Sequence, residues 1–582
     1  MVPDLSVAAP APAPGRVVRV NGALVEVEGL GDLAMSELVA LGPQELPGEV
    51  VSIQGGGASV QAYEYTGGLA TGDVARALGR PLSAHLGPDL LGGVFDGLLR
   101  PLRDAPTWLR PGPDRPAGST SWPWKPLVEP GDPVHEGQVL GSVERGGRLE
   151  HRVLVPVGVS GPVKQVRPSG EWPDDEVLAV VAATPVTMTS TWPVRRPRPV
   201  RARVAAGEPL TTGQRVLDAV FPLARGSSVA VPGGFGTGKT MLLQQIAKWC
   251  SADVIVYVGC GERGNEMADV LTELAELSDP RTGRPLAERI VVIANTSNMP
   301  MMAREASIYT GVTVAEFFRD MGYHSVVIAD STSRWAEALR EFASRSGALP
   351  TEEGYPAVLP SALAAFYERA GRVVTLGGLD ASVTIIGAVS PPGGDTTEPV
   401  TAHTQRFVRD LWNLDRELAY ARHYPAVGWV GSFSRDADLL GHWYARHGDP
   451  EWSRRRARVS GLLAEADRLG DLADLVGAGS LPGHERVVLL AGRLLREGVL
   501  QQNALSENDA YCTAAKTAAL VDMVLDVVDR CEALVDRAVS ASEIEEVDFS
   551  TVLRAAQETP PDDAAGVVVR RDAMLALLGG LG

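Results

Sequence analysis

Four mostly apolar runs stand out in the central part of the chain, at residues 254–259, 290–294, 325–329 and 383–389. Stretches with the apolar spacing of amphipathic helices separate them. Continuous apolar runs of this length, rather than alternating ones, are typical of parallel strands that are buried on both faces. The pattern therefore predicts an α/β domain over residues 196–440.

Shorter apolar segments precede this region. The runs at residues 17–20 and 23–27 are joined by Asn21-Gly22, a pair that favours a tight hairpin turn. A second such pair follows on either side of three consecutive glycines. This spacing predicts a small N-terminal β-barrel over residues 16–75.

The composition changes after residue 110, where Pro, Gly, Trp and Val punctuate short apolar runs. We expect an inserted β-sandwich module over residues 111–195, joined to the barrel by a partly helical connector at residues 76–110. The module resembles a biotinyl or lipoyl carrier domain. Its two lysines, Lys125 and Lys164, do not stand on a hairpin that would carry such a group. The module is therefore predicted to be structural, without a cofactor.

The two ends of the chain differ from its centre. After Asp436 the apolar spacing becomes helical, as at residues 518–535, and predicts an all-α domain over residues 441–582. Residues 1–15 are rich in Pro and Ala, with neither a basic segment nor a long apolar run, and predict a disordered leader rather than a signal peptide. No apolar run reaches the ~18 residues expected of a membrane-spanning helix.

The net charge and the cysteine content limit the functions that this chain can have. The net charge is -18, which disfavours binding to nucleic acid or to anionic lipid. The basic stretch at residues 195–203 is short and interrupted by prolines, so we expect a solvated linker there. The four cysteines form no CxxC pair and indicate a reducing compartment.

The strongest motif is a glycine-rich segment of the form G-x-x-x-x-G-K-T between an apolar run and an amphipathic helix. Its glycines let successive backbone N–H groups curl around a polyphosphate, and the helix N-terminus adds a favourable dipole. The lysine ammonium reaches the β- and γ-phosphates, and the threonine hydroxyl ligates Mg²⁺. The predicted nucleotide-binding residues are Gly233, Gly234, Phe235, Gly236, Thr237, Gly238, Lys239 and Thr240.

Two carboxylates end apolar runs, where α/β sheets place their ligands. Glu262 follows residues 254–259, and we expect it to polarise the attacking water. Asp330 follows residues 325–329 and is expected to hold Mg²⁺, through water because this ion dehydrates reluctantly. Arg263 is a further catalytic candidate that would steady phosphate charge. No other arginine is an obvious transition-state finger, which predicts a site completed by a partner subunit.

These motifs resemble the catalytic A (alpha) subunit of V-type/archaeal-type (V/A) rotary ATPases, and the resemblance runs over nearly the whole chain. The module at residues 111–190 stands where this family carries a module that the F-type catalytic β subunit lacks. An intact P-loop together with Glu262 separates the chain from the non-catalytic B subunit. Further family-like segments are GCGERGNEMADVL, ADSTSRWAEALRE, EEGYPA, VTIIGAVSPPGGD and LQQNALSENDAYC.

The resemblance implies hydrolysis or synthesis of ATP, with ATP/ADP and Mg²⁺ bound, coupled to stalk rotation and to transmembrane transport of H⁺ or Na⁺. It implies that Tyr424 flanks the adenine and that Gln501 or Gln502 closes the far side of the base. It also implies an alternating hexamer with a B-type subunit that supplies an arginine in trans, and contacts with central and peripheral stalk subunits. Other subunits would then hold the chain peripherally on the cytoplasmic side of the cell membrane.

The chain departs from the family pattern in two places. Thr237 replaces the P-loop cysteine of eukaryotic relatives, so the redox control linked to that cysteine should be missing. Val358, Pro360 and Ala362 stand in a stretch where the family usually has Tyr and Arg.

Three alternatives remain open from the sequence. A chain of the same assembly that binds ATP but is catalytically impaired is favoured only by the changes at residues 358–362. An RNA-translocating hexameric ATPase is disfavoured by the net charge of -18. A secretion or flagellar export ATPase is disfavoured by the inserted module.

Overall fold

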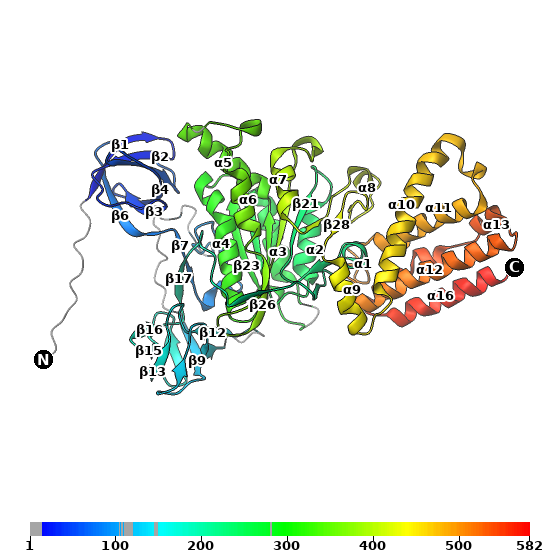
Figure 1. Cartoon of the computed structure of the whole chain (residues 1–582), viewed down its shortest axis with the longest axis horizontal. Coiled ribbons are helices and arrows are strands. Elements are labelled where there is room, and N and C mark those ends of the chain that lie inside the picture. Colours follow the sequence, from blue (N-terminus) through cyan, green and yellow to red (C-terminus); the bar gives the residue numbers. More distant parts are fainter. Residues whose placement is uncertain are drawn as a thin grey trace.

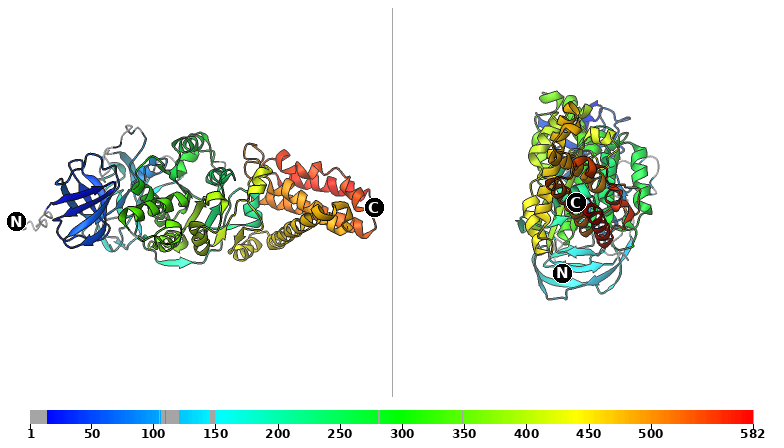
Figure 2. Two further views of the ribbon diagram at one scale, coloured as in Figure 1. Left: turned by 90° about the horizontal axis from the view of Figure 1, so that it is seen from above. Right: turned by 90° about the vertical axis from the view of Figure 1, so that its right-hand side faces the viewer.

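The chain forms an elongated molecule with a β-barrel at one end, a helical domain at the other and an α/β domain between them (Figure 1). The computed structural model describes residues 14–103, 105, 109, 120–144, 149–279, 282–347 and 349–581. Most of the predicted leader, residues 1–13, lies outside the described residues. The β-sandwich projects from the side of the α/β domain near the barrel (Figures 1 and 2). The multi-domain fold class predicted from the sequence is confirmed.

The N-terminal barrel is closed by six strands in the order β1-β2-β5-β4-β3-β6. These are β1 (Gly15–Asn21), β2 (Leu24–Glu28), β3 (Glu37–Leu41), β4 (Leu46–Gln54), β5 (Gly57–Ala62) and β6 (Val74–Pro81). Asn21-Gly22 turns the chain between β1 and β2, with Gly22 at a φ of +58°. Two predicted boundaries are wrong. Gly15 belongs to β1 rather than to the leader, and β6 extends the barrel past residue 75 because it pairs with both β1 and β3.

The inserted module contains two four-stranded sheets that share one apolar core, which confirms the predicted β-sandwich. The sheets have the orders β10-β13-β15-β16 and β12-β11-β9-β14. Trp124, Leu140 and Val163 are among the side chains buried between them. The strands are β9 (Ser121–Pro126), β10 (Pro133–Val134), β11 (Val139–Val143), β12 (His151–Leu154), β13 (Gly161–Val166), β14 (Gly170–Pro173), β15 (Ala179–Val181) and β16 (Thr184–Val186).

The predicted connector at residues 76–110 is more ordered than its sequence suggested. Its strand β7 (Ser83–Leu86) pairs with β17 (Ser190–Pro193), so the segments before and after the module run side by side. One 3₁₀ turn, η1 (Pro88–Leu90), follows. Strand β8 (Val94–Phe95) then joins the edge of the central sheet beside β23 (Ile290–Thr296). A two-residue strand carries no pattern of its own, so only its partner reveals it.

The α/β domain is built on a ten-stranded sheet whose main path is β28-β27-β21-β26-β24-β22-β23-β8, with β25 and β18 attached to the side of β26. The remaining strands of this sheet are β18 (Ala202–Val204), β21 (Ser228–Pro232), β22 (Val254–Glu262), β24 (His324–Asp330), β25 (Gly371–Val374), β26 (Asp380–Val389), β27 (Asp410–Leu411) and β28 (Phe433–Ser434). Along the path from β27 to β8 each strand is parallel to the next, whereas β28 and β25 are antiparallel to β27 and β26. The four predicted apolar runs are β22, β23, β24 and β26. A separate two-stranded sheet joins β19 (Pro209–Leu210) to β20 (Leu223–Ala224).

Helices cover both faces of this sheet, as the doubly buried strands require. In β22, Ile255 and Tyr257 face the cluster that includes α2 and α3, whereas Val256 and Val258 face the cluster that includes α4 and α5. The helices are α1 (Arg215–Val220), α2 (Lys239–Trp249), α3 (Gly264–Glu276), η2 (Leu286–Arg289), α4 (Met301–Asp320), α5 (Thr332–Ser346), η3 (Glu352–Gly354), α6 (Leu359–Tyr367), η4 (Pro392–Gly394), α7 (Pro399–Phe407) and α8 (Arg416–Tyr420).

The C-terminal domain is helical, as predicted, and lies at the end of the molecule opposite the barrel (Figure 2). Its elements are α9 (Ala437–Arg446), α10 (Trp452–Val476), η5 (Ala478–Ser480), α11 (Gly483–Leu495), the π-helical segment η6 (Arg496–Leu500), α12 (Ala514–Asp536), α13 (Ala541–Glu545), α14 (Ser550–Leu553), α15 (Ala555–Glu558) and α16 (Ala564–Gly579). The predicted domain boundary at residue 440 falls inside α9. One apolar cluster continues from the α/β domain into these helices. Among the described helices, none combines the length and the apolar character needed to cross a membrane.

Candidate active site

The glycine-rich segment lies between β21 and α2, at the carboxyl edge of the sheet. Gly236 and Gly238 have φ values of +81° and +80°, a region of backbone space that glycine enters without strain. A Cβ on Gly233 would lie 2.6 Å from Thr237 Oγ1, so the turn is too tight for a side chain there. The Phe235 ring is 99% exposed at the tip of the turn. The segment thus has the curled backbone that phosphate binding requires.

The parallel sheet brings the two predicted carboxylates to the same edge. Glu262 is the last residue of β22 and Asp330 the last of β24, and these strands are direct neighbours. Both side chains line one cleft with the P-loop. The other side chains of this cleft include Lys239, Thr240, Arg263, Glu266, Asp269, Glu273, Arg304, Ser333, Arg334, Glu337 and Ser390.

Asp330 is buried, and its two carboxylate oxygens differ in their hydrogen bonding. Its Oδ2 accepts hydrogen bonds from Thr240 Oγ1 at 3.2 Å and from Tyr257 OH at 3.4 Å. Its Oδ1 is buried and accepts no hydrogen bond from the described residues. Burial raises the pKa of this carboxyl, and the nearby Lys239 ammonium opposes the rise. A buried carboxylate with an unused oxygen beside a threonine hydroxyl has the hard oxygen donors that suit Mg²⁺.

The charges of Glu262 and Lys239 depend on each other. Burial, followed by the Asp330 carboxylate, raises the pKa of Glu262 to about 8. Burial lowers the pKa of Lys239, and the two carboxylates act in the opposite direction. Lys239 Nζ donates to Ser390 Oγ and approaches the Val389 carbonyl at 3.5 Å. Two carboxylates with raised pKa values beside a half-buried lysine whose pKa is lowered are typical of a functional site.

Three arginines line the described part of the cleft, two of which the sequence did not single out. The side chain of Arg263 is 70% exposed and lies 3.9 Å from Glu266. Arg334 pairs with Glu337 at 3.0 Å, and the Arg304 side chain also reaches the cleft. The signal for Arg334 was its place four residues after Asp330, in the first turn of α5. Ser390, which accepts a hydrogen bond from Lys239, directly follows the last residue of β26. Its place at the carboxyl end of a predicted strand was the corresponding signal in the sequence.

Of the three residues expected around the base, Tyr424 contacts the P-loop, and the two glutamines contact the segment that contains Tyr424. A Cβ on Gly238 would lie 2.9 Å from Tyr424 Cε1, so the Tyr424 ring packs directly against the last glycine of the loop. Gln502 donates its backbone N–H to the Tyr424 carbonyl at 2.8 Å. The Gln502 amide is used inside the fold, whereas Gln501 Nε2 contacts the Arg422 carbonyl at 3.3 Å near the surface.

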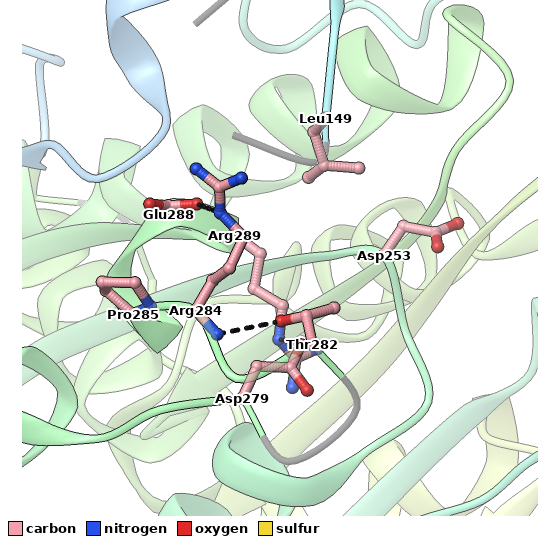
Figure 3. Close-up of a pocket in the computed structure, with 8 residues that line it drawn as sticks. All are labelled: Leu149, Asp253, Asp279, Thr282, Arg284, Pro285, Glu288 and Arg289. Atoms are coloured by element: carbon pink, nitrogen blue, oxygen red, sulfur yellow. Dashed lines mark hydrogen bonds and ion pairs between the residues drawn. The ribbon is translucent and has the colours of Figure 1, made fainter. Parts of the chain in front are cut away.

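A second pocket, drawn in Figure 3, lies at the opposite, amino-terminal edge of the strands. Asp253 and Arg289 stand immediately before β22 and β23, and Arg284 Nε donates to Glu288 at 2.9 Å. Arg289 pairs with Asp279 at 3.1 Å. Among the described residues that line this pocket there is none of the predicted site residues.

Family models match four consecutive parts of the chain. The β-barrel domain of the ATP synthase alpha/beta family matches residues 17–79, and the barrel-sandwich domain of the alpha/beta subunits matches residues 117–195. The nucleotide-binding domain of the same family matches residues 213–434. The C-terminal domain of V and A type ATP synthase matches residues 441–544.

Relatives match over almost their full length. The V-type ATP synthase alpha chain of Nitrosococcus oceani is 47% identical, over 91% of this chain and 92% of that protein. The V-type ATP synthase alpha chain of Anaeromyxobacter dehalogenans (strain 2CP-C) is 46% identical, over 97% of this chain and 99% of that protein. The corresponding A-type ATP synthase chain of Thermofilum pendens is 46% identical, over 91% of this chain and 90% of that protein. The chain belongs to the alpha-chain family of the V-type and A-type ATP synthases. This membership favours neither an RNA-translocating nor an export ATPase.

A solved structure also shares the architecture of this V-type/A-type family member. The assembled ATPase EscN from the type III secretion system of enteropathogenic E. coli has a TM-score of 0.64, at 21% identity, over 88% of this chain and all of that one. At that identity the likeness shows the fold alone. The match to the nucleotide-binding domain of the ATP synthase family supports binding of ATP and ADP by residues 213–434.

Proposed function

We propose that this chain is the catalytic subunit of a rotary V/A-type ATPase or ATP synthase, with its chemistry in the cleft at the carboxyl edge of the sheet. The observation that carries the proposal is the convergence of Lys239, Thr240, Glu262 and Asp330 on that cleft. Each comes from a different position at one edge of a parallel sheet, where such folds bind their ligands. Turnover there drives stalk rotation and transport of H⁺ or Na⁺ through other subunits.

Each residue of the cleft has a role that follows from the chemistry of its side chain or backbone. The backbone N–H groups of residues 233–240 and the Lys239 ammonium bind the phosphates and offset their negative charge. Glu262 orients the attacking water and accepts its proton. Arg263, exposed at the cleft, steadies phosphate charge. Tyr424, which packs against Gly238, flanks the adenine, and Gln501, whose Nε2 donates to the Arg422 carbonyl, closes the far side of the base.

Thr240 and Asp330 would hold Mg²⁺. The fit rests on the unused Asp330 Oδ1 and on the Thr240 hydroxyl 3.2 Å from the other carboxylate oxygen. When bound, the ion neutralises charge on the β- and γ-phosphates. The protein's part is to hold the two oxygen ligands at a fixed separation on adjacent elements, the start of α2 and the end of β24.

Replacing Asp330 by Asn should raise the Mg²⁺ concentration needed for half-maximal ATP binding and turnover by roughly 10–100-fold. The amide keeps the shape of the side chain but removes its negative charge and replaces one of the two carboxylate oxygens by an NH₂ group, which cannot accept from Thr240 or face a cation. A Mg²⁺ titration of nucleotide binding by calorimetry measures the change. The matched control is Asp269→Asn, on α3 in the same cleft. Unchanged Mg²⁺ dependence in Asp330→Asn would exclude Asp330 as a metal residue.

A neighbouring B-type subunit completes the site with an arginine in trans, in an alternating hexamer. The Phe235 ring at the mouth of the cleft is almost fully exposed, so a neighbouring subunit can reach it. The sandwich module projects away from the long axis of the molecule, which supports a contact with a peripheral stalk (Figure 1). The chain is then held on the cytoplasmic side of the cell membrane by other subunits.

Rapid hydrolysis of Mg-ATP is expected only when this chain is mixed with the B-type subunit from the same source. The isolated chain lacks the trans arginine, so it should bind nucleotide but turn over slowly. Steady-state ATPase assays of the chain, the partner and the mixture decide the point. Full activity of the isolated chain would rule out completion in trans.

A mixture that binds ATP but never turns over would instead favour the catalytically impaired alternative. The geometry of the cleft does not favour it, because its described lining includes none of residues 358–362. Pro360 occupies the first turn of α6, where its missing N–H costs no helical hydrogen bond, and Ala362 packs on the apolar core.

A further inference from the structure

Arg215 is a fully buried arginine at the start of α1, outside the cleft that holds the phosphates. Its guanidinium donates to three acceptors on one segment of the C-terminal domain. Nη1 donates to Asp509 Oδ1 at 2.5 Å, Nε donates to the Val499 carbonyl, and Nη2 donates to the Gln501 carbonyl. The side chains of Arg215 and Asp509 are 0% and 1% exposed, so the pair is removed from water.

The acceptors explain why an arginine stands there. Val499 lies in the π-helical segment η6, and Gln501 is its C-terminal cap. The last carbonyls of a helix have no intrahelical donor, and a cation near a helix C-terminus is stabilising. The planar, forked guanidinium can serve two carbonyls and a carboxylate at once, which the single ammonium of a lysine cannot do with the same geometry. Arg215 therefore fixes the direction in which the chain leaves η6.

The segment that leaves η6 runs directly to the base side of the nucleotide cleft. The Gln502 side chain accepts from the Arg215 backbone N–H at 2.9 Å and donates to the Gly213 carbonyl at 3.0 Å. Its own backbone N–H donates to the Tyr424 carbonyl at 2.8 Å. Gln502 is 4% exposed, so its amide is committed to these contacts rather than to a ligand.

Tyr424 in turn packs against the P-loop. The place of a Cβ on Gly238 is 2.9 Å from the Tyr424 ring, which leaves the ring no room to move toward the loop. A continuous set of contacts thus joins Arg215 to Gln502, Gln502 to Tyr424, and Tyr424 to Gly238. These contacts bypass the charged side chains of the cleft.

We propose that Arg215 is a positioning residue for the nucleotide base: by capping η6 and pairing with Asp509 it holds the Gln501–Gln502 turn against Tyr424. The inference rests on the proposed function in taking Tyr424 as the wall of the base site. Arg215 touches no nucleotide atom in this scheme. It sets the affinity for the base and leaves phosphate binding and the chemical step to the residues of the cleft.

The test compares ATP with tripolyphosphate, which has the phosphates but no base. In the intact complex carrying Arg215→Lys, the KM for ATP should rise about tenfold, while kcat and the inhibition constant of tripolyphosphate stay within about twofold of wild type. Asp509→Asn, which removes the charge partner, is the second variant and should show the same split. Arg455→Lys is the matched control, because Arg455 is also buried and pairs with Asp449 and Asp522 away from this segment.

The outcomes distinguish the positioning role of Arg215 from the assignment of Tyr424 to the base site. An equal loss for ATP and tripolyphosphate in Arg215→Lys, no change in either, or failure of both variants to assemble would overturn the positioning role. Tyr424→Ala is measured alongside them. If Tyr424→Ala weakens ATP selectively and Arg215→Lys does not, the inference fails and the base site stands. If Tyr424→Ala has no selective effect, the assignment of Tyr424 in the proposed function fails instead.

Discussion

Replacing Glu262 by Gln is expected to lower the rate of ATP hydrolysis about a thousandfold and to leave ATP binding nearly unchanged, because a positioned general base contributes ~10²–10⁴-fold. The amide keeps the size of the side chain at the end of β22 but cannot accept the proton of the attacking water. Lys239, Thr240 and the glycines of the P-loop remain in place to bind the phosphates. Single-turnover hydrolysis and equilibrium binding of ATP measure the two effects separately.

The pH dependence of kcat/KM gives a second readout of the same carboxylate. Burial and the Asp330 carboxylate raise the pKa of Glu262 to about 8. A base works in its deprotonated form, so kcat/KM should rise with pH as Glu262 loses its proton and fall as the pH drops below that range. The apparent pKa belongs to the coupled carboxylates rather than to Glu262 alone. The Glu262→Gln variant should lack this limb of the profile.

Glu273→Gln is the matched control for Glu262. It lies on α3 at the same cleft and pairs with Lys248 at 2.9 Å, away from the end of β22. It should retain most of the wild-type rate. If Glu262→Gln turns over ATP as fast as Glu273→Gln does, Glu262 is not the base.

Replacing Lys239 by Met should weaken ATP binding at least about a hundredfold and abolish measurable turnover, because hydrogen bonds to charged groups contribute ~1.5–3 kcal/mol each. The methionine keeps much of the aliphatic stem in the buried space between α2 and Ser390. It removes the only lysine ammonium that lines the described part of the cleft. Calorimetric titration with Mg-ATP and with Mg-ADP measures the loss, which should be larger for ATP because of its γ-phosphate.

Lys248→Met provides the comparison for Lys239→Met. Lys248 is on the same helix, but it lies in the last turn and pairs with Glu273. Its loss should change ATP binding by less than about threefold, since its ammonium pairs with Glu273 and it is not among the described residues that line the cleft. Equal weakening by the two substitutions would mean that α2 was damaged as a whole and that Lys239 has no special contact with phosphate.

The apolar pattern of the chain was enough to predict the main strands of the sheet and two carboxylates of the cleft. The runs at β22, β23, β24 and β26 are long enough and apolar enough on both faces to be strands only in a doubly covered parallel sheet. Once they are parallel, their carboxyl ends meet at one edge, so Glu262 and Asp330 had to approach the P-loop. This inference needs only local pattern and the geometry of the sheet.

Contacts between distant segments were decided by the tertiary structure alone. Strand β8 has two residues and exists because β23 offers an open edge, and the barrel closes only when β6 reaches both β1 and β3. The sequence left both Gln501 and Gln502 as candidates. In the structure the backbone N–H of Arg215, 287 residues earlier, donates to the side chain of Gln502. The local pattern of apolar residues indicates which face of an element is buried. It does not indicate which distant donor will hydrogen-bond to a buried carbonyl.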